Sequence, residues 1–264
     1  KLLSTYIDTL PALVSGDGRL HARFNQAGTT TGRFSSSDPN LQNIPVKTEL
    51  GKKIRDAFVA QKGFELVSLD YSQIELRIAA LLSQDEFLTQ VFADGKDVHS
   101  AVAMKVFGVS EGDVTQEMRR RAKVINFGIL YGMGVNALKD ALGTDRKEAQ
   151  IFYDNYFEQF PKIEGYLDGV IEEVKNNGYT TTLFGRRRYF PGIRSPLPFI
   201  KAMAERMAIN APIQGTSADL IKIAILRVDE YLAKHKLQNS VRLVLQVHDE
   251  LVFEVKKDVE QKIL

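Results

Sequence analysis

The segment from residue 64 to residue 80 most constrains the fold, because its hydrophobic period changes partway along. Apolar residues first form a short run that ends at Leu69, which is typical of a strand buried on both faces. From Ser72 onward, apolar residues recur at helical spacing as far as Leu82. Asp70 therefore lies where we expect a strand to end and a helix to begin.

Asp70 has two interpretations. An aspartate just before a helix can cap the first amide groups, which stabilises a helix by about 1 kcal/mol. A side chain at such a corner is also displayed at the end of a rigid strand, close to the amide donors of a helix N-terminus. The residue alone favours the cap, so a functional interpretation needs support from the rest of the chain.

Composition excludes several classes of protein. The chain has 264 residues, of which 44% are hydrophobic and 26% charged, as is ordinary for globular domains. It has no cysteine, so disulfides and thiolate metal sites are excluded. No membrane-spanning run or secretion signal is visible, so we expect a soluble protein that is not exported, and a cytoplasmic one if its source is bacterial rather than phage or organellar. The net charge of +2 means that nucleic-acid binding must be argued from charge clusters.

A second candidate carboxylate lies near the C-terminal end. Residues 241–255 alternate in polarity around His248 and Asp249, which predicts a hairpin with these two residues at its tip. If this hairpin pairs with the first strand, Asp70 and Asp249 converge, with Glu250 beside them. Two adjacent carboxylates repel, and an oxygen-only site of this kind favours Mg²⁺. A pair of such ions promotes in-line phosphoryl displacement.

Residues 115–132 predict a helix with one functional face. Four side chains at intervals of four share this broad face: Arg119, Lys123, Phe127 and Tyr131. Two cations followed by rings suit a triphosphate and its base. A charged surface helix with aromatic residues in the core explains the pattern equally well. Gly128 and Gly132 weaken the helix, so we expect a close approach or a helix end there.

The other segments give a coarser prediction. We expect a polar loop at residues 19–48, whose hydroxyl and amide groups suit a sugar-phosphate backbone. Helices are expected at residues 87–92, 97–107, 146–160 and 162–177, a hairpin at 179–190 with Arg186, Arg187 and Arg188 on its return arm, a loop at 195–199, and helices at 201–210 and 216–236. A turn at residues 212–215 would separate the last two helices and expose Gln214.

Three of these segments also resemble motifs of a known family, the bacterial DNA polymerase I family (family A). Residues 70–77, DYSQIELR, look like its motif A, and residues 119–132 resemble its motif B. Residues 246–250, QVHDE, resemble motif C, and the loop at 31–45 is similar to the same family. The resemblance extends over essentially the whole chain. It departs at Leu197-Pro198-Phe199, where family members usually have a polar residue followed by an arginine, and at Gly134, where a serine is common.

The resemblance implies an α+β fold of the right-hand polymerase type, with an antiparallel palm sheet and a helical fingers subdomain. Residues 1–85 would form the first part of the palm, with the DNA-binding loop and motif A. Residues 86–200 would form the fingers, and residues 201–264 the second part of the palm with motif C. The thumb is expected to be absent from this chain, together with the last palm elements and any nuclease domains, so we expect a fragment.

The resemblance also implies a role for each site residue. Asp70 and Asp249 would hold two Mg²⁺ ions, or Mn²⁺ as a substitute, with the backbone carbonyl of Tyr71, while Glu250 would be a secondary acid. Lys123 would be catalytic and would also bind the dNTP, together with Gln73, Glu75, His99, Arg119, Phe127 and Tyr131. The DNA contacts would come from Arg33, Gln42, Asn43, Arg206, Gln214 and His248. Glu75 would act as a steric gate that leaves no room for a ribose 2′-hydroxyl.

The expected function is template-directed DNA synthesis in replication and repair. A dNTP would be added to the primer 3′-hydroxyl with release of pyrophosphate, by a monomer bound to primer-template DNA and, in a bacterial source, associated with the nucleoid. Single-subunit RNA polymerases share the fold and both aspartates, but Glu75 argues against them. A non-catalytic DNA-binding fragment is the alternative from another class, and a general Mg²⁺ phosphohydrolase is the more distant one.

Overall fold

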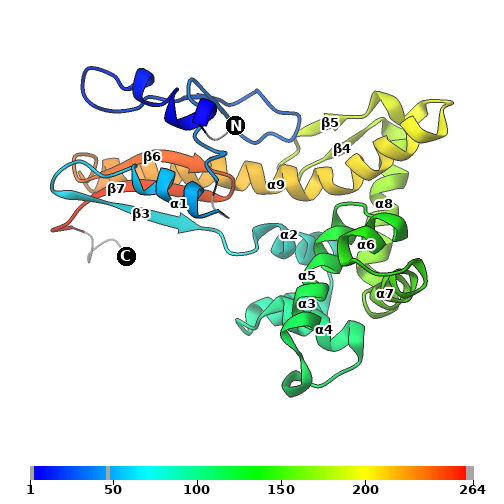
Figure 1. Ribbon diagram of the computed structural model, residues 1–264. Coiled ribbons are helices and arrows are strands. Elements are labelled where there is room, and N and C mark those ends of the chain that lie inside the picture. The colour runs from blue at the N-terminus through cyan, green and yellow to red at the C-terminus, as the bar shows by residue number, and fades with distance from the viewer. Residues whose placement is uncertain (1–2, 46–47, 260–264) are drawn as a thin grey trace. The chain divides into compact units, whose positions relative to one another are not determined.

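The computed structural model describes residues 3–45 and 48–259, and the chain divides into two compact units (Figure 1). The first unit comprises Lys1–Ser72 and Ala218–Leu264, and the second comprises Gln73–Ser217. The long helix α9 (Pro198–Lys234) contributes to both. The three-part division into palm, fingers and palm stays a prediction, and its outermost residues, 1–2 and 260–264, lie outside the described part.

The first unit contains a three-stranded antiparallel sheet in the order β3–β7–β6. Its strands are β3 (Phe64–Asp70), β6 (Val241–Val247) and β7 (Glu250–Lys256). The predicted strand and the predicted hairpin are both confirmed, and they are direct neighbours in the sheet. Residues of α9 pack on one face of this sheet against Val67, Phe253 and Val255.

The expectation that the first strand is buried on both faces is wrong. Leu66 is 42% exposed and Leu69 is 49% exposed. Among the described strands, β3 lies at an edge of its sheet. The hydrophobic cluster formed with α9 covers the face that carries Val67, which leaves Leu66 exposed on the opposite face. Leu69 shares the face of Val67 but is exposed near the end of the strand. A continuous apolar run does not reveal whether one face or both will be covered.

The polar segment at residues 19–48 is more regular than the predicted loop. It contains a short antiparallel pair, β1 (Arg23–Asn25) with β2 (Ser35–Ser37), and the helix α1 (Glu49–Asp56) follows it. Two short helical turns, Leu3–Ile7 and Pro11–Leu13, precede it. Strands of three residues give too short an alternation to be distinguished from a loop by period.

The second unit is mostly helical. Its helices before α9 are α2 (Ile74–Ser83), α3 (Glu86–Ala93), α4 (Val98–Phe107), α5 (Gln116–Leu130), α6 (Val135–Leu142), α7 (Arg146–Gln159) and α8 (Pro161–Asn177), with short turns at Glu111–Asp113 and Pro191–Arg194. The hairpin pairs β4 (Tyr179–Thr181) with β5 (Arg187–Tyr189). The helices predicted before residue 178 are confirmed to within about two residues at their ends, and α6 was not predicted.

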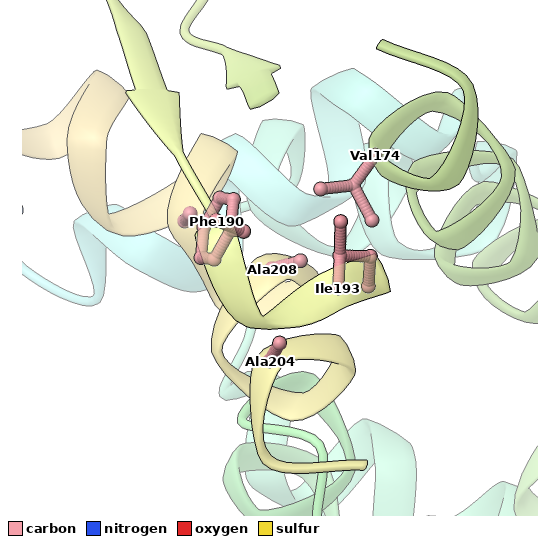
Figure 2. Close-up of a cluster of buried hydrophobic side chains, with 6 residues drawn as sticks. Val174, Phe190, Ile193, Ala204 and Ala208 are labelled. Carbon is pink, nitrogen blue, oxygen red and sulfur yellow. The ribbon is translucent and has the colours of Figure 1, made fainter. Parts of the chain in front are cut away.

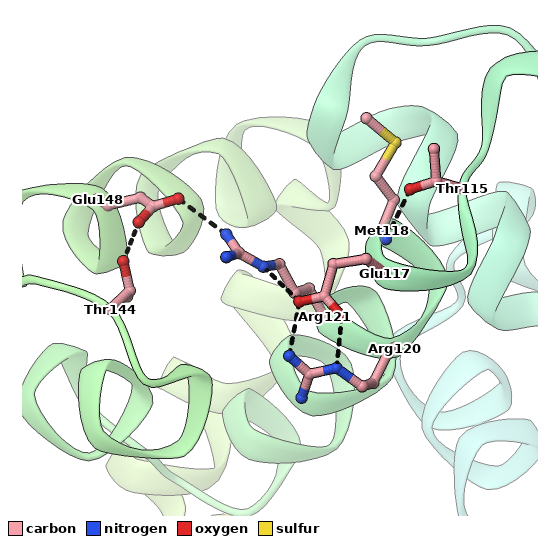
Figure 3. Close-up of polar contacts among 7 residues, drawn as sticks. All are labelled: Thr115, Glu117, Met118, Arg120, Arg121, Thr144 and Glu148. Carbon is pink, nitrogen blue, oxygen red and sulfur yellow. Dashed lines mark hydrogen bonds and ion pairs between the residues drawn. The ribbon is translucent and has the colours of Figure 1, made fainter.

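Side-chain caps and ion pairs fix helix α5 in this unit (Figure 3). The Thr115 hydroxyl accepts a hydrogen bond from the Met118 amide, as the sequence predicts for an N-cap. Glu117 accepts hydrogen bonds from Arg120 and Arg121 on the same helix, and Arg121 also donates to Glu148 of α7 at 2.8 Å. Arg121 therefore ties α5 to α7, whereas Arg120 is paired within α5.

A hydrophobic cluster joins α8 and α9 to the segment after β5 (Figure 2). Val174 of α8 packs with Phe190 and Ile193, and these meet Ala204 and Ala208 of α9. The small alanine side chains allow the chain after the hairpin to lie close to the α9 backbone. The hairpin is thereby fixed to two helices of its own unit.

The predicted break in α9 is wrong. We expected two helices separated by a turn at residues 212–215, but α9 runs through Pro212 without interruption. A proline removes one backbone hydrogen bond from a helix. Here the neighbouring residues Ala211 and Ile213 are buried, and their packing outweighs that loss. Gln214 is therefore half-buried on a helix rather than exposed in a turn.

The expected loop at residues 195–199 also ends early, because α9 starts with Pro198, a residue suited to the first helical position.

Within residues 3–45 and 48–259, every helix is either too short or too polar to cross a lipid bilayer.

Candidate active site

The site residues predicted from the sequence fall into two groups, one in each unit. The first unit carries Asp70, Tyr71, Arg33, Gln42, Asn43, His248, Asp249 and Glu250, and the second carries Gln73, Glu75, His99, Arg119, Lys123, Phe127, Tyr131, Arg206 and Gln214.

In the first unit, two candidate metal ligands lie at the same end of the sheet. Asp70, the last residue of β3, pairs in register with Glu250, the first residue of β7. The Tyr71 amide donates a hydrogen bond to the backbone carbonyl of Asp249 at 3.3 Å. His248 adopts a left-handed conformation, with φ of 55°, in the two-residue turn between β6 and β7. The strand pairing thus brings together the two acids that the sequence singled out.

Asp70 lies in a partly buried corner beside two other acids. Partial burial, followed by the charges of Asp249 and Glu250, raises the pKa of Asp70. Asp70 does not cap the next helix, because α2 has Gln73 at its N-cap position and no side-chain cap hydrogen bond. The alternative explanation of Asp70 as a cap is therefore wrong.

Two neighbouring groups limit how much of this charge is exposed. The Arg33 guanidinium lies 3.8 Å from a carboxylate oxygen of Asp249. Glu250 accepts a hydrogen bond from the Ser68 hydroxyl on β3. Sequence reasoning missed both contacts, since Arg33 and Asp249 are far apart in the chain and neither lies in a local pattern that links them.

The donor set at this corner fits a hard divalent cation. In the described ranges, no three His, Cys, Asp or Glu side chains gather into a preformed metal site. Mg²⁺ needs only one or two carboxylates, because it retains several waters and also binds substrate phosphates. Burial is the main cause of the raised pKa of Asp70, and the charges of Asp249 and Glu250, which a bound cation would offset, add to it.

A glutamine pair ties the polar segment to the same sheet. The side-chain amide of Gln42 donates to the side-chain oxygen of Gln246 at 2.9 Å and to the Gln246 carbonyl at 3.2 Å. The Gln246 amide in turn donates to the carbonyl of His248. The carbonyl of Asn43 accepts a hydrogen bond from the Tyr6 hydroxyl at 2.6 Å. These bonds fix the candidate DNA-binding residues beside the turn that carries Asp249.

In the second unit, α5 presents the predicted cationic and aromatic face. Lys123 is exposed and Phe127 is half-buried, while Tyr131 lies at the C-cap with 38% of its surface exposed. The rings of Phe127 and Tyr131 are stacked with centroids 6.0 Å apart, and His99 of α4 lies 5.7 Å from Phe127. The aromatic part of this face is therefore one continuous group of rings.

Arg119 already has an acidic partner that sequence reasoning missed. Its guanidinium donates two hydrogen bonds to Asp97, at 3.2 and 2.7 Å, and Asp97 also caps α4 through the Ser100 amide. Burial works in the opposite direction, but hydrogen bonds from Arg119 and Ser100 lower the pKa of Asp97 to about 2. A pattern of acid spacing could have indicated the cap, but not the ion pair between two helices.

The buried environment of His99 favours its neutral form. The side chain is 3% exposed, and burial lowers its pKa; the positive charges of Lys123 and Arg119 act in the same direction, whereas the negative charge of Asp97 opposes the shift. Its Nδ1 atom has no hydrogen-bond partner among the described residues. The imidazole can therefore offer a hydrogen bond without adding a charge.

Glu75 is a buried carboxylate held by the end of α5. It is 6% exposed in the first turn of α2, and the Tyr131 hydroxyl donates a hydrogen bond to it. Gln73 precedes it with φ of 55°, a strained backbone for a residue other than glycine. Burial and this hydrogen bond give the Glu75 carboxylate a fixed position.

The two glycines at the end of α5 allow close approach, as predicted. A Cβ on Gly132 would lie 3.2 Å from the backbone of Arg206 on α9, and its φ of 73° disfavours any side chain. A Cβ on Gly128 would meet the sulfur of Met133 at 2.9 Å. Arg206 itself is exposed, and Gln214 lies two turns further along α9.

Comparison with known proteins gives one consistent answer. The sequence model of DNA polymerase family A matches residues 1–264. "DNA polymerase I, thermostable" of Thermus thermophilus is 52% identical over 264 residues, which is 100% of this chain and 31% of that protein. DNA polymerase I of Pseudomonas aeruginosa is 48% identical over 264 residues, again 100% of this chain and 29% of that protein. The chain thus spans under a third of the length of these two relatives.

A solved structure matches as well. The POL domain of Pol1 from M. smegmatis, in complex with DNA primer-template and dNTP, superposes with a TM-score of 0.93 and 44% identity. The match covers 98% of this chain and 46% of that one. Because the family model covers the complete sequence and the relatives are so similar, the chain belongs to DNA polymerase family A.

Proposed function

We propose that this chain carries the catalytic centre of a template-directed DNA polymerase, which adds dNTPs to a primer 3′-hydroxyl and releases pyrophosphate. The observation that carries the proposal is the register of β3 with β7, which places Asp70 beside Glu250 and next to Asp249. Family membership supports it, as does the primer-template DNA and dNTP bound to the similar M. smegmatis domain.

Asp70 and Asp249, with the backbone carbonyl of Tyr71, are the residues that would hold two Mg²⁺ ions. Such ions, when bound, activate the attacking hydroxyl and stabilise the leaving oxygen of an in-line displacement. The contribution of the chain itself is a rigid corner. Asp70 ends β3, Asp249 lies in the turn between β6 and β7, and the backbone hydrogen bond between Tyr71 and Asp249 limits their separation.

Arg119 and Lys123 would receive the negative charge of the triphosphate. The Arg119 guanidinium is held by Asp97, so a phosphate must displace that carboxylate or share the guanidinium with it. Exposed Lys123 would act as the catalytic cation at the leaving phosphates. Neutral His99 would add a hydrogen bond to the same group of donors. Phe127 and Tyr131 offer ring surfaces against which a base and sugar can stack.

Glu75 would select deoxyribonucleotides. A carboxylate that is buried and held by the Tyr131 hydroxyl cannot move away from a ribose 2′-hydroxyl at low cost. This fixed carboxylate favours a DNA polymerase over the related single-subunit RNA polymerases, which must admit that hydroxyl.

The DNA contacts would lie on both units. In the first, Arg33, Gln42, Asn43 and His248 adjoin the turn that carries Asp249, and in the second, Arg206 and Gln214 lie along α9. Arg33 can read base-pair shape in the minor groove with little sequence preference. Its ion pair with Asp249 would link primer position to the catalytic corner.

Primer extension by the intact protein that carries this sequence tests the proposal. Asp249→Asn keeps the side-chain shape but removes the charge, so we expect the extension rate to fall by at least about a hundredfold. The matched control is Asp56→Asn, an exposed acid at the end of α1 in the same unit, which should extend at the wild-type rate. Wild-type extension by Asp249→Asn would refute the mechanism, and a wild-type protein that binds DNA without extending it would support the non-catalytic alternative.

A further inference from the structure

The hairpin β4–β5 lies in the most one-sidedly charged segment of the chain. Residues 174–204 contain six lysines and arginines and no acidic residue, although the whole chain carries a net charge of only +2. The basic residues are Lys175, Arg186, Arg187, Arg188, Arg194 and Lys201. The proposed polymerase mechanism uses none of them.

The strand register gives this hairpin two different faces. Tyr179 pairs with Tyr189, and Thr181 pairs with Arg187, so these four residues share one face. We call it the outer hairpin face. Thr180 and Arg188 lie on the opposite face, where Thr180 is buried and the Arg188 guanidinium lies 5.1 Å from the ring of Phe190.

The outer hairpin face combines an exposed ring and a half-buried ring with a cation. The rings of Tyr179 and Tyr189 have centroids 5.4 Å apart, and the Arg187 guanidinium lies 4.5 Å from the centroid of Tyr179. Tyr189 is 64% exposed and Arg187 is also exposed. Glu173 of α8 is an acidic neighbour of this face and accepts a hydrogen bond from the Thr181 hydroxyl at 3.5 Å. The guanidinium of Arg187 lies over the ring of Tyr179.

The hairpin is rigidly attached to its own unit. Phe190, directly after β5, packs between α8 and α9 (Figure 2). Near the turn, the Leu183 amide donates to the hydroxyl of Thr216 on α9 at 3.0 Å, and Arg186 donates to the Gly215 carbonyl at 3.0 Å. The rings of Tyr179 and Tyr189 therefore stand on a fixed support, which reduces the entropy lost when a ligand binds.

We propose that the outer hairpin face binds single-stranded nucleic acid. Unpaired bases can stack on exposed aromatic and guanidinium planes with little regard to sequence, whereas bases inside a duplex already stack on one another. The positive charge of the segment complements the phosphate backbone. This contact goes beyond the proposed reaction, because it holds an unpaired strand and contributes no reacting group.

Fluorescence anisotropy with the intact protein tests this surface, using a labelled oligothymidylate and a labelled blunt duplex as the two probes. We expect Tyr189→Ala to raise the dissociation constant for the single strand about tenfold and to leave that for the duplex unchanged. Tyr189→Phe keeps the ring and should bind as the wild type does. Arg187→Gln should reduce the slope of log affinity against log salt by roughly 0.7, the value for one phosphate contact on a single strand.

Matched controls exist on the second half of α9. Tyr231→Ala and Arg227→Gln remove an exposed ring and an exposed cation beside Asp229 and Glu230, and they should change neither probe. Unchanged single-strand affinity in Tyr189→Ala would overturn the proposal, and so would an equal loss on both probes. Displacement of the oligonucleotide by polyglutamate at equal charge would also overturn it, in favour of a general polyanion surface. Because Asp249→Asn should retain this binding, failure here is distinguishable from failure of the polymerase mechanism.

Discussion

Asp70 is a residue whose proposed role in catalysis comes at the expense of stability. Its folded-state pKa is raised by burial and by its acidic neighbours, so the folded protein binds a proton at Asp70 more tightly than the unfolded chain does. The stability that this group contributes is present at low pH and is lost as the pH rises through the raised pKa. At neutral pH the charged carboxylate therefore opposes folding, which is expected of a functional site and not of a helix cap.

Glu75 gives the sharpest test at the residue scale. In Glu75→Ala the buried carboxylate is gone, so we expect the preference for dNTP over rNTP to fall by about a hundredfold in steady-state incorporation assays. Tyr131→Phe removes only the hydroxyl that holds Glu75, and it should cause a smaller fall. An unchanged preference in Glu75→Ala would exclude this residue as the steric gate.

At the scale of elements, the spacing of residues along the sequence predicted the features that depend on contacts between near neighbours in the chain. The helical spacing of Arg119, Lys123 and Phe127 sufficed to place them on one face of α5. The partner of Arg119 could not be predicted, because Asp97 belongs to another helix and the pair depends on helix packing. At Pro212 the local signal was misleading: proline usually breaks a helix, but the burial of its neighbours keeps α9 continuous there.

The end of α5 offers a stability test of the close approach inferred for Gly132. In Gly132→Ala the new Cβ meets the backbone of Arg206 at 3.2 Å and the residue must keep a φ of 73°, so we expect destabilisation of about 1–2 kcal/mol. Gly134→Ala is the matched control, because its backbone φ of −84° suits alanine and a Cβ there meets no atom within 4 Å. Urea unfolding followed by circular dichroism measures both. Equal midpoints in the two variants would show that α9 does not constrain this turn.

At the scale of the whole molecule, the sequence predicted the strand pairing that brings Asp70 and Asp249 together but not the contacts around them. The proximity of Asp70 and Asp249 could be predicted because Asp70 ends a recognisable strand, Asp249 lies at the tip of a recognisable hairpin, and the strand and the hairpin pair in one sheet. The ion pair of Arg33 with Asp249 depends on the path of an irregular segment, and that path cannot be predicted from hydrophobic periodicity. Nor does the order of elements indicate that α9 serves both units.

Metal binding tests the central claim most directly, because it does not depend on turnover. Mn²⁺ can be titrated into the intact protein while electron paramagnetic resonance follows the free ion. We predict that Asp70→Asn and Asp249→Asn each weaken a Mn²⁺ site at least about tenfold relative to the wild type. Asp56→Asn should leave that site unchanged, and wild-type affinity should fall as acid protonates Asp70. Wild-type Mn²⁺ affinity in both Asp70→Asn and Asp249→Asn would contradict the assignment of these two carboxylates as metal ligands.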